Sequence, residues 1–273
     1  MEYFFTSKYF SIRWYSILIM LGIFLAIIFT INEARKFNLS KDFIINIAFW
    51  IIVGGIICAR IYYVIFSWNE YKSNPIDIFK IWEGGLAIHG GLLGGFLMMW
   101  LYCKKYKVRL IRFLDIICPY VLLAQAIGRW GNFFNQEVYG QTVSSSAWWL
   151  PSFVQNQMVI GGSYKAPLYF LEGVINLGGF ILLGRVIPTL MGKHYKHGDV
   201  TFAYFVFYGI VRVVLEPVRD SQFNMGGEDN MRAVYMAIAY VGGGLLLILI
   251  NHLIRFKLEK DPDFFKRMIK SKK

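Results

Sequence analysis

Several apolar stretches of this chain are long enough to cross a lipid bilayer as helices, which takes about 20 consecutive apolar residues. The chain is 273 residues long and 56% hydrophobic, and only 17% of its residues are charged. Soluble domains usually carry about 25% charged residues. These features predict an all-α polytopic membrane protein, with a single integral membrane domain over residues 1–273.

We expect about seven transmembrane helices. Their predicted ranges are 12–32, 43–66, 85–103, 113–128, 168–191, 200–216 and 232–254. The longest predicted connection, at about 129–166, contains Trp148 and Trp149, which are suited to the membrane interface. A small extracytoplasmic subdomain with room for short strands is expected there.

The formal net charge of +12 could indicate a nucleic-acid partner, but its distribution argues against one. Lysines and arginines are concentrated in the predicted loops 31–42, 104–112 and 192–199 and in the C-terminal stretch 255–273. Positive loops of membrane proteins stay in the cytoplasm. We therefore expect an outside N-terminus, a basic cytoplasmic tail at about 255–273, and no nucleic-acid partner.

An arginine lies at membrane depth, at the end of the predicted helix 113–128. Arg129 belongs to the run Gly128–Gly140, which also contains Asn132, Asn135 and Glu137. A guanidinium at this depth costs about 2.5–3.5 kcal/mol on insertion scales. Simple lipid packing does not explain such a run, so it predicts a site that holds a polar or anionic group.

Two further sequence features could join this site. Arg212 and Glu216 are spaced i,i+4, which puts them on one helix face. They either form a structural pair, or Glu216 orients Arg212 and leaves its other donors for a phosphate. His89 lies in a glycine-rich run over 84–95 that would let another helix or a ligand approach it, and it is either structural or catalytic. Arg60 and Glu172 give weaker signals of the same kind.

Together these residues predict a buried polar set near the outer face of the membrane. Its members are His89, Arg129, Asn132, Asn135, Glu137, Arg212, Glu216 and Arg219. Converging guanidiniums would bind a phosphodiester, and a nearby histidine could exchange protons. The sequence contains no Gly-x-Ser-x-Gly or His-Glu-x-x-His motif, and Cys58, Cys103 and Cys118 show no metal-binding or disulfide spacing. The residues alone thus indicate a phospholipid-handling site and leave open whether it is catalytic.

The run over 128–140 resembles the signature of the bacterial prolipoprotein diacylglyceryl transferase family, with Gly-Arg-x-Gly-Asn-Phe-x-Asn-x-Glu at its centre. The resemblance covers about residues 11–255. Further matches occur in the family's order at Arg13-Trp14-Tyr15, Gly54-Gly55, Ala59–Tyr63, Trp82–Gly85, His89–Leu92, Asp115, Pro167, Glu172, Arg212, Glu216 and Arg219. The chain departs from the family pattern at Tyr169, Val211, Pro217 and the segment Asp220–Phe223.

The resemblance implies an enzyme of lipoprotein biosynthesis in the bacterial cell membrane. Such a transferase moves the diacylglyceryl group of phosphatidylglycerol to the lipobox cysteine thiol of a preprolipoprotein, still attached to its signal peptide. A thioether forms and glycerol phosphate leaves, and no metal or cofactor is expected. The active site is expected toward the outer leaflet.

The resemblance also suggests a role for each site residue. The expected catalytic residues are His89 as the base, Arg129 and Arg212 holding the phosphate, and Glu216 orienting an arginine, as Glu137 also would. The expected substrate-binding residues are Tyr15, Arg60, Asn132, Asn135, Glu137, Gly140, Glu172 and Arg219.

Two other readings remain open from the sequence. An anionic phospholipid transporter or flippase would also need intramembrane arginines and glycine-broken helices, although the inverted repeat typical of such proteins is not evident. A catalytically inactive relative that serves as a membrane scaffold is the other.

Overall fold

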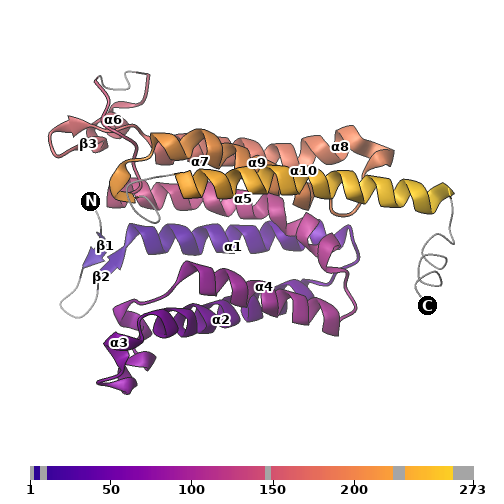
Figure 1. The fold of residues 1–273 in the computed structure, drawn as a ribbon, viewed down its shortest axis with the longest axis horizontal. Coiled ribbons are helices and arrows are strands. Elements are labelled where there is room, and N and C mark those ends of the chain that lie inside the picture. The colour runs from indigo at the N-terminus through magenta and orange to yellow at the C-terminus, as the bar shows by residue number, and fades with distance from the viewer. Residues whose placement is uncertain (1–2, 7–10, 145–148, 224–230, 261–273) are drawn as a thin grey trace. The chain divides into compact units, whose positions relative to one another are not determined.

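All seven segments predicted to be helical form helices in the computed structural model, which describes residues 3–6, 11–144, 149–223 and 231–260 (Figure 1). They are α1 (Trp14–Arg35), α2 (Lys41–Phe66), α4 (Ile88–Lys105), α5 (Leu110–Asn135), α7 (Leu168–Ile181), α9 (Asp199–Leu215) and α10 (Met231–Lys260). Within the described residues, six helical segments are long and apolar enough to cross a membrane. The 18-residue α4 is not among them, so the predicted number of seven spans stays a prediction.

The chain divides into two compact units. One comprises Met1–Ala26 and Ile117–Lys273, and the other comprises Ile27–Ile116. We call them the first and second unit.

In the second unit, glycines bring α2 and α4 into close contact. A Cβ on Gly90 would lie 2.9 Å from Cα of Ala59, and one on Gly94 would lie 2.5 Å from the carbonyl oxygen of Gly54. Side chains at these positions would therefore push the helices apart. The glycine-rich run around His89 thus admits a neighbouring helix, one of the two possibilities raised by the sequence.

The connection from α2 to α4 contains α3 (Trp68–Tyr71) and two 3-10 turns, at Pro75–Phe79 and Ile81–Glu83. Large apolar side chains are exposed along it, among them Phe79 and Trp82.

In the first unit, α9 and α10 run side by side, with α7 beside α9 (Figure 1). Gly209 of α9 and Gly244 of α10 make this approach possible, because a Cβ on either would lie within 3 Å of a backbone carbonyl oxygen of the other helix. The described part of α10 ends at Lys260, and the predicted tail beyond it lies outside the described residues.

The span that begins with α7 contains a π-helical turn, Leu182–Val186, before α8 (Ile187–Met191) and a 3-10 turn at Gly192–His194. Gly184 in this turn faces Pro119, which lies inside α5. A proline ring inside a helix disturbs the regular hydrogen bonding, and the widened turn packs against it.

The connection after α5 is a small subdomain with short strands, as predicted. It contains α6 (Ser152–Gln157) and the antiparallel pair β3 (Val159–Ile160) and β4 (Ser163–Tyr164). Its apolar core joins Phe133 and Tyr169 of the helices to Leu150, Val154 and Met158. Trp149 is exposed, and Trp148 lies outside the described residues.

Two features at the edges of the first unit were not predicted. An antiparallel pair, β1 (Tyr3–Thr6) and β2 (Ser11–Arg13), precedes α1. After α9 the chain forms 3-10 turns at Glu216–Val218 and Ser221–Phe223. Pro217 in the first of these lacks the backbone N–H that another helical turn would need.

Candidate active site

The central polar residues lie within α5 and not in the loop that follows it. The predicted helix ended at residue 128, but α5 continues to Asn135. Arg129, Asn132 and Asn135 are spaced by three residues, so they share one face of the last two turns. The predicted boundary was wrong because it treated polar residues as the end of the helix.

The helix ends in a geometry that brings Glu137 back over this face. The N–H of Gln136 donates to the carbonyl of Phe133 at 3.3 Å, and the N–H of Glu137 donates to that of Asn132 at 3.0 Å. This pair of bonds is a Schellman motif, which usually has glycine where Gln136 lies. Gln136 and Val138 both have positive φ values, 49° and 57°. A β-branched residue pays a steric cost in this conformation, and such strain clusters at functional sites.

The carboxylate of Glu137 accepts hydrogen bonds from both asparagines of this face. Asn132 donates to its Oε1 at 3.1 Å, and Asn135 donates to the same atom at 3.3 Å. Asn132 in turn accepts from Nη1 of Arg129 at 3.4 Å. Glu137 therefore contacts Arg129 through Asn132, and its predicted role in orienting an arginine stays a prediction.

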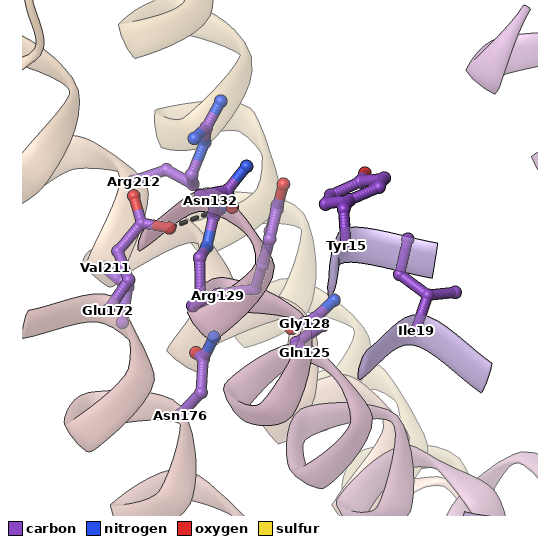
Figure 2. Close-up of a pocket in the computed structure, with 11 residues that line it drawn as sticks. Tyr15, Ile19, Gln125, Gly128, Arg129, Asn132, Glu172, Asn176, Val211 and Arg212 are labelled. Carbon is purple, nitrogen blue, oxygen red and sulfur yellow. Dashed lines mark hydrogen bonds and ion pairs between the residues drawn. The ribbon is translucent and has the colours of Figure 1, made fainter. Parts of the chain in front are cut away.

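Three arginines and two glutamates form one continuous chain of ion pairs. Glu172 of α7 pairs with Arg129 (Figure 2) and, at 3.3 Å, with Arg219. Glu216 pairs with Arg219 at 3.3 Å and with Arg212 at 3.0 Å. The i,i+4 pairing predicted for Arg212 and Glu216 is thus present.

The ion-paired chain carries one more positive than negative charge, since three guanidiniums share two carboxylates. The carboxylates are the most deeply buried members, with Glu172 3% and Glu216 1% exposed. Arg219 lies between them, and its burial, reinforced by nearby Arg212, lowers its pKa. Arginine still keeps its charge in proteins.

A cavity of about 220 Å³ opens beside this chain (Figure 2). Its lining residues come from α1, α5, α7 and α9, all within the first unit. They are Tyr15, Ile19, Gln125, Gly128, Arg129, Asn132, Glu172, Asn176, Tyr208, Val211 and Arg212. The two guanidiniums that line it, those of Arg129 and Arg212, are the more exposed ones, at 23% and 15%, whereas Arg219 is 6% exposed and does not line the cavity.

Five of the predicted site residues line the cavity: Tyr15, Arg129, Asn132, Glu172 and Arg212. Three polar lining residues were not predicted, namely Gln125, Asn176 and Tyr208. Each of these lies four residues from a predicted site residue on the same helix, namely Arg129, Glu172 and Arg212. An i,i+4 search from the predicted residues would therefore have found them.

Arg60 lies in the second unit, where its guanidinium binds five backbone carbonyls. It donates to Asp77 at 2.7 Å, to Ile78 and Gly84 at 2.8 Å, to Gly85 at 3.0 Å and to Lys80 at 3.4 Å. A guanidinium has five N–H donors, so all are in use. Arg60 therefore organises the 77–85 loop, and its predicted substrate-binding role stays a prediction.

His89 also lies in the second unit, at the second residue of α4. Its ring stacks with that of Tyr62, with the centroids 6.3 Å apart, and the residue is exposed within that unit. Its predicted role as a base stays a prediction.

Gly140 joins the connecting subdomain to the segment after α9. It forms a β-bridge with Arg219 and donates to the carbonyl of Ala166 at 2.8 Å. A Cβ at Gly140 would lie 2.9 Å from the carbonyl oxygen of Val218. The structure thus gives Gly140 a close backbone approach that fixes Arg219, while its predicted substrate contact stays a prediction.

The helices and the cavity together define a class of protein. It is a multi-pass membrane protein with a cationic cavity among its helices. Among the residues that the structure describes, no group of three or more His, Cys, Asp or Glu side chains could hold a metal ion.

The chain belongs to the prolipoprotein diacylglyceryl transferase family, whose model matches residues 2–250. It is similar to three proteins named phosphatidylglycerol–prolipoprotein diacylglyceryl transferase. The protein of Streptococcus mutans is 40% identical over 252 residues, or 90% of this chain and 94% of that protein. That of Streptococcus equi subsp. zooepidemicus strain H70 is 42% identical over 256 residues, or 93% and 95%. That of Staphylococcus saprophyticus is 36% identical over 241 residues, or 87% and 85%.

Proposed function

We propose that this chain transfers the diacylglyceryl group of phosphatidylglycerol to the lipobox cysteine of a preprolipoprotein. The cysteine sulfur attacks the glycerol carbon that bears the phosphate and forms a C–S thioether bond. The C–O bond to the phosphate breaks, its electron pair stays on the phosphate oxygen, and glycerol phosphate leaves. The nucleophile belongs to the substrate, so no cysteine of the enzyme takes part.

The two guanidiniums that line the cavity are the observation that supports this function best. A phosphodiester carries one negative charge, and its oxygens accept the charge-assisted hydrogen bonds that guanidiniums donate. Arg129 and Arg212 line the cavity, and we assign the phosphate to them. Among the described residues, Arg212 uses only Nη1 in its ion pair with Glu216, so its other donors are available for the phosphate.

The surrounding residues would fix these two arginines before the substrate arrives. Glu172 and Glu216 hold the guanidiniums, and Glu137 positions Asn132 beside Arg129. Asn132 would bind the glycerol backbone or the headgroup. Tyr15, which lies on α1, would help to position a substrate. Such preorganised donors stabilise developing charge without reorganising during the reaction.

His89 is our candidate for the base that takes the proton of the thiol. A free thiol has a pKa near 8.5 and reacts as the thiolate, so the transfer needs a group that takes its proton. We further propose that Arg60 acts indirectly, by shaping the loop that leads to His89.

We propose a cell-membrane location with the cavity toward the outer leaflet. The charges of the predicted loops favour an outside N-terminus and 129–166 connection, with the basic tail at 255–273 in the cytoplasm. Preprolipoproteins would then reach the cavity from the side to which they are exported.

The test is thioether formation by the purified full-length protein. Vesicles that contain phosphatidylglycerol are mixed with a lipobox peptide, and the mass gain of a diacylglyceryl group is measured. We expect product with the wild type, and a loss of about 100- to 1,000-fold with Arg129→Ala, the range for one lost preorganised donor.

Arg185→Ala is the matched control. Arg185 is an exposed arginine on the same span as Glu172, and it does not line the cavity. It should retain activity. Near-normal lipidation by a correctly inserted Arg129→Ala variant would contradict the assignment, and absence of product from the wild type would contradict the function itself.

A further inference from the structure

The cavity has an inner wall that the reaction described above does not use. Ile19, Gln125, Asn176 and Tyr208 each lie one helical turn from Tyr15, Arg129, Glu172 and Arg212, respectively. Each residue of the inner wall is closer to the middle of its membrane-spanning helix than its partner one turn away. The inner wall is therefore displaced from the arginines by about 5.4 Å, the pitch of a helix, toward the bilayer centre.

Asn176 is the notable residue of this wall. It is 6% exposed and lines the cavity, and Figure 2 shows its side chain extending from α7 toward Arg129. Among the residues that the structure describes, its carboxamide has no hydrogen-bond partner. Because Asn176 lines the cavity, a ligand bound there can complete the hydrogen bonding of this amide.

Tyr208 offers a second donor on the same wall. Its ring stacks on that of Tyr204, with centroids 6.1 Å apart. The described contacts include no hydrogen bond to its hydroxyl. By contrast, Gln125 already donates from Nε2 to the Tyr204 hydroxyl at 3.1 Å. Asn176 and Tyr208 therefore both line the inner part of the cavity, and each carries a hydrogen-bond donor.

We propose that Asn176, assisted by Tyr208, binds an ester carbonyl of the diacylglycerol moiety and so selects ester-linked over ether-linked lipid. This inference rests on the proposed function. With the phosphate at Arg129 and Arg212, the acyl chains run toward the bilayer centre. The ester groups follow the phosphate by a few covalent bonds on that side, where Asn176 lies. The headgroup glycerol extends the other way, toward water.

The side chains of Asn176 and Tyr208 fit an ester carbonyl better than an acyl chain or an ether oxygen. An ester carbonyl is a pure acceptor and needs donors, which an amide N–H₂ and a phenol supply. An acyl chain offers no polar atom, and an ether oxygen is the weaker acceptor. The inner wall thus distinguishes the two linkages through a single class of interaction.

The experiment is a competition between two lipids in one membrane. Phosphatidylcholine vesicles carry equal small amounts of a diacyl phosphatidylglycerol and its dialkyl ether analogue, with full-length protein and a lipobox peptide. The two products differ in mass. We expect wild type to prefer the ester lipid about tenfold, the ratio that corresponds to one hydrogen bond of about 1.4 kcal/mol.

The variant Asn176→Leu keeps the side-chain volume and removes the donor. It should lower the rate with the ester lipid about tenfold and leave the rate with the ether lipid within about twofold. Asn176→Ala is the second variant, and Ile19→Val is a control on the same wall that changes no polar atom. A purely structural role would lower both rates together.

Equal use of the two lipids by the wild type would overturn the proposal, as would an equal loss with both lipids in the Asn176 variants. Failure of the proposed function gives a different result, since the wild type would then form no thioether with either lipid.

Discussion

The shared carboxylate of Glu172 leads to an unequal pair of mutational effects. Glu172 serves Arg129 and Arg219, while Arg129 has Glu172 as its ion-pair partner. Glu172→Gln should therefore destabilise the protein much more than Arg129→Gln. The activity should follow a different order, because Arg129 is the residue that we place on the phosphate.

The magnitudes follow from burial. The Glu172 side chain is 3% exposed, and its loss leaves two arginines short of a counter-charge. Breaking a buried pair in this way costs about 3–5 kcal/mol. The Arg129 side chain is 23% exposed, and after its removal Glu172 keeps Arg219. Its loss should cost about 1 kcal/mol, close to the upper end for solvent-exposed ion pairs.

Thermal unfolding can be followed through the protein's own cysteines. Cys118 is buried in the first unit, so its thiol becomes reactive toward a fluorogenic maleimide only when the unit opens. We expect a large fall in midpoint for Glu172→Gln and a small one for Arg129→Gln. Lipidation should be lost in Arg129→Gln although it is nearly as stable as wild type.

The double variant sharpens the test. If Glu172 acts mainly by neutralising its arginines, adding Arg129→Gln to Glu172→Gln should recover part of the lost stability. The reasoning is refuted if the two single variants lose equal stability, or if the double variant is no more stable than Glu172→Gln alone.

Three further predictions concern other parts of the chain. Arg60→Lys should expose the 77–85 loop to limited proteolysis, because one ammonium cannot replace five guanidinium bonds; unchanged cleavage would refute the role of Arg60 in the loop. Gly140→Ala should destabilise the protein by about 1–3 kcal/mol and so lower the thermal midpoint, because the added Cβ would lie too close to the carbonyl oxygen of Val218. An unchanged midpoint would contradict this close approach. Lys165 donates to Asp220 at 2.8 Å and lowers the pKa of that carboxyl. The stabilisation is therefore present above the unfolded pKa of about 4 and is lost as the pH falls further, by less than about 1 kcal/mol. Asp220→Asn should flatten this part of the stability curve.

Apolar run length was a reliable guide to the helices, since lipid leaves the backbone few alternatives. The polar set was also largely visible in the sequence, because an arginine at membrane depth calls for a partner or a ligand. The i,i+4 rule predicted the pairing of Arg212 with Glu216, which lie on one helix. Pairs between helices were different: nothing local to Glu172 indicates that it joins Arg129 to Arg219.

The end of α5 was not predictable from polarity alone. Polar residues usually mark loops, but here they lie on a helical face that lines a cavity. The turn that ends the helix uses Gln136 and Val138 at positive φ, where a sequence signal would normally be glycine. Arg60 could not be assigned either, because the carbonyls that it binds carry no residue-specific signature.

The connected form of the ion-paired chain matters for the chemistry that we propose. Three isolated pairs would leave no net charge, and a substrate phosphate would have to displace a carboxylate. Sharing two carboxylates among three guanidiniums fixes each arginine and leaves one positive charge in excess. During transfer, negative charge moves from the sulfur to the departing phosphate, which changes from a diester to a monoester. The cationic excess therefore interacts more strongly with the transition state than with the bound lipid, which is the condition for it to increase the rate and not only the affinity.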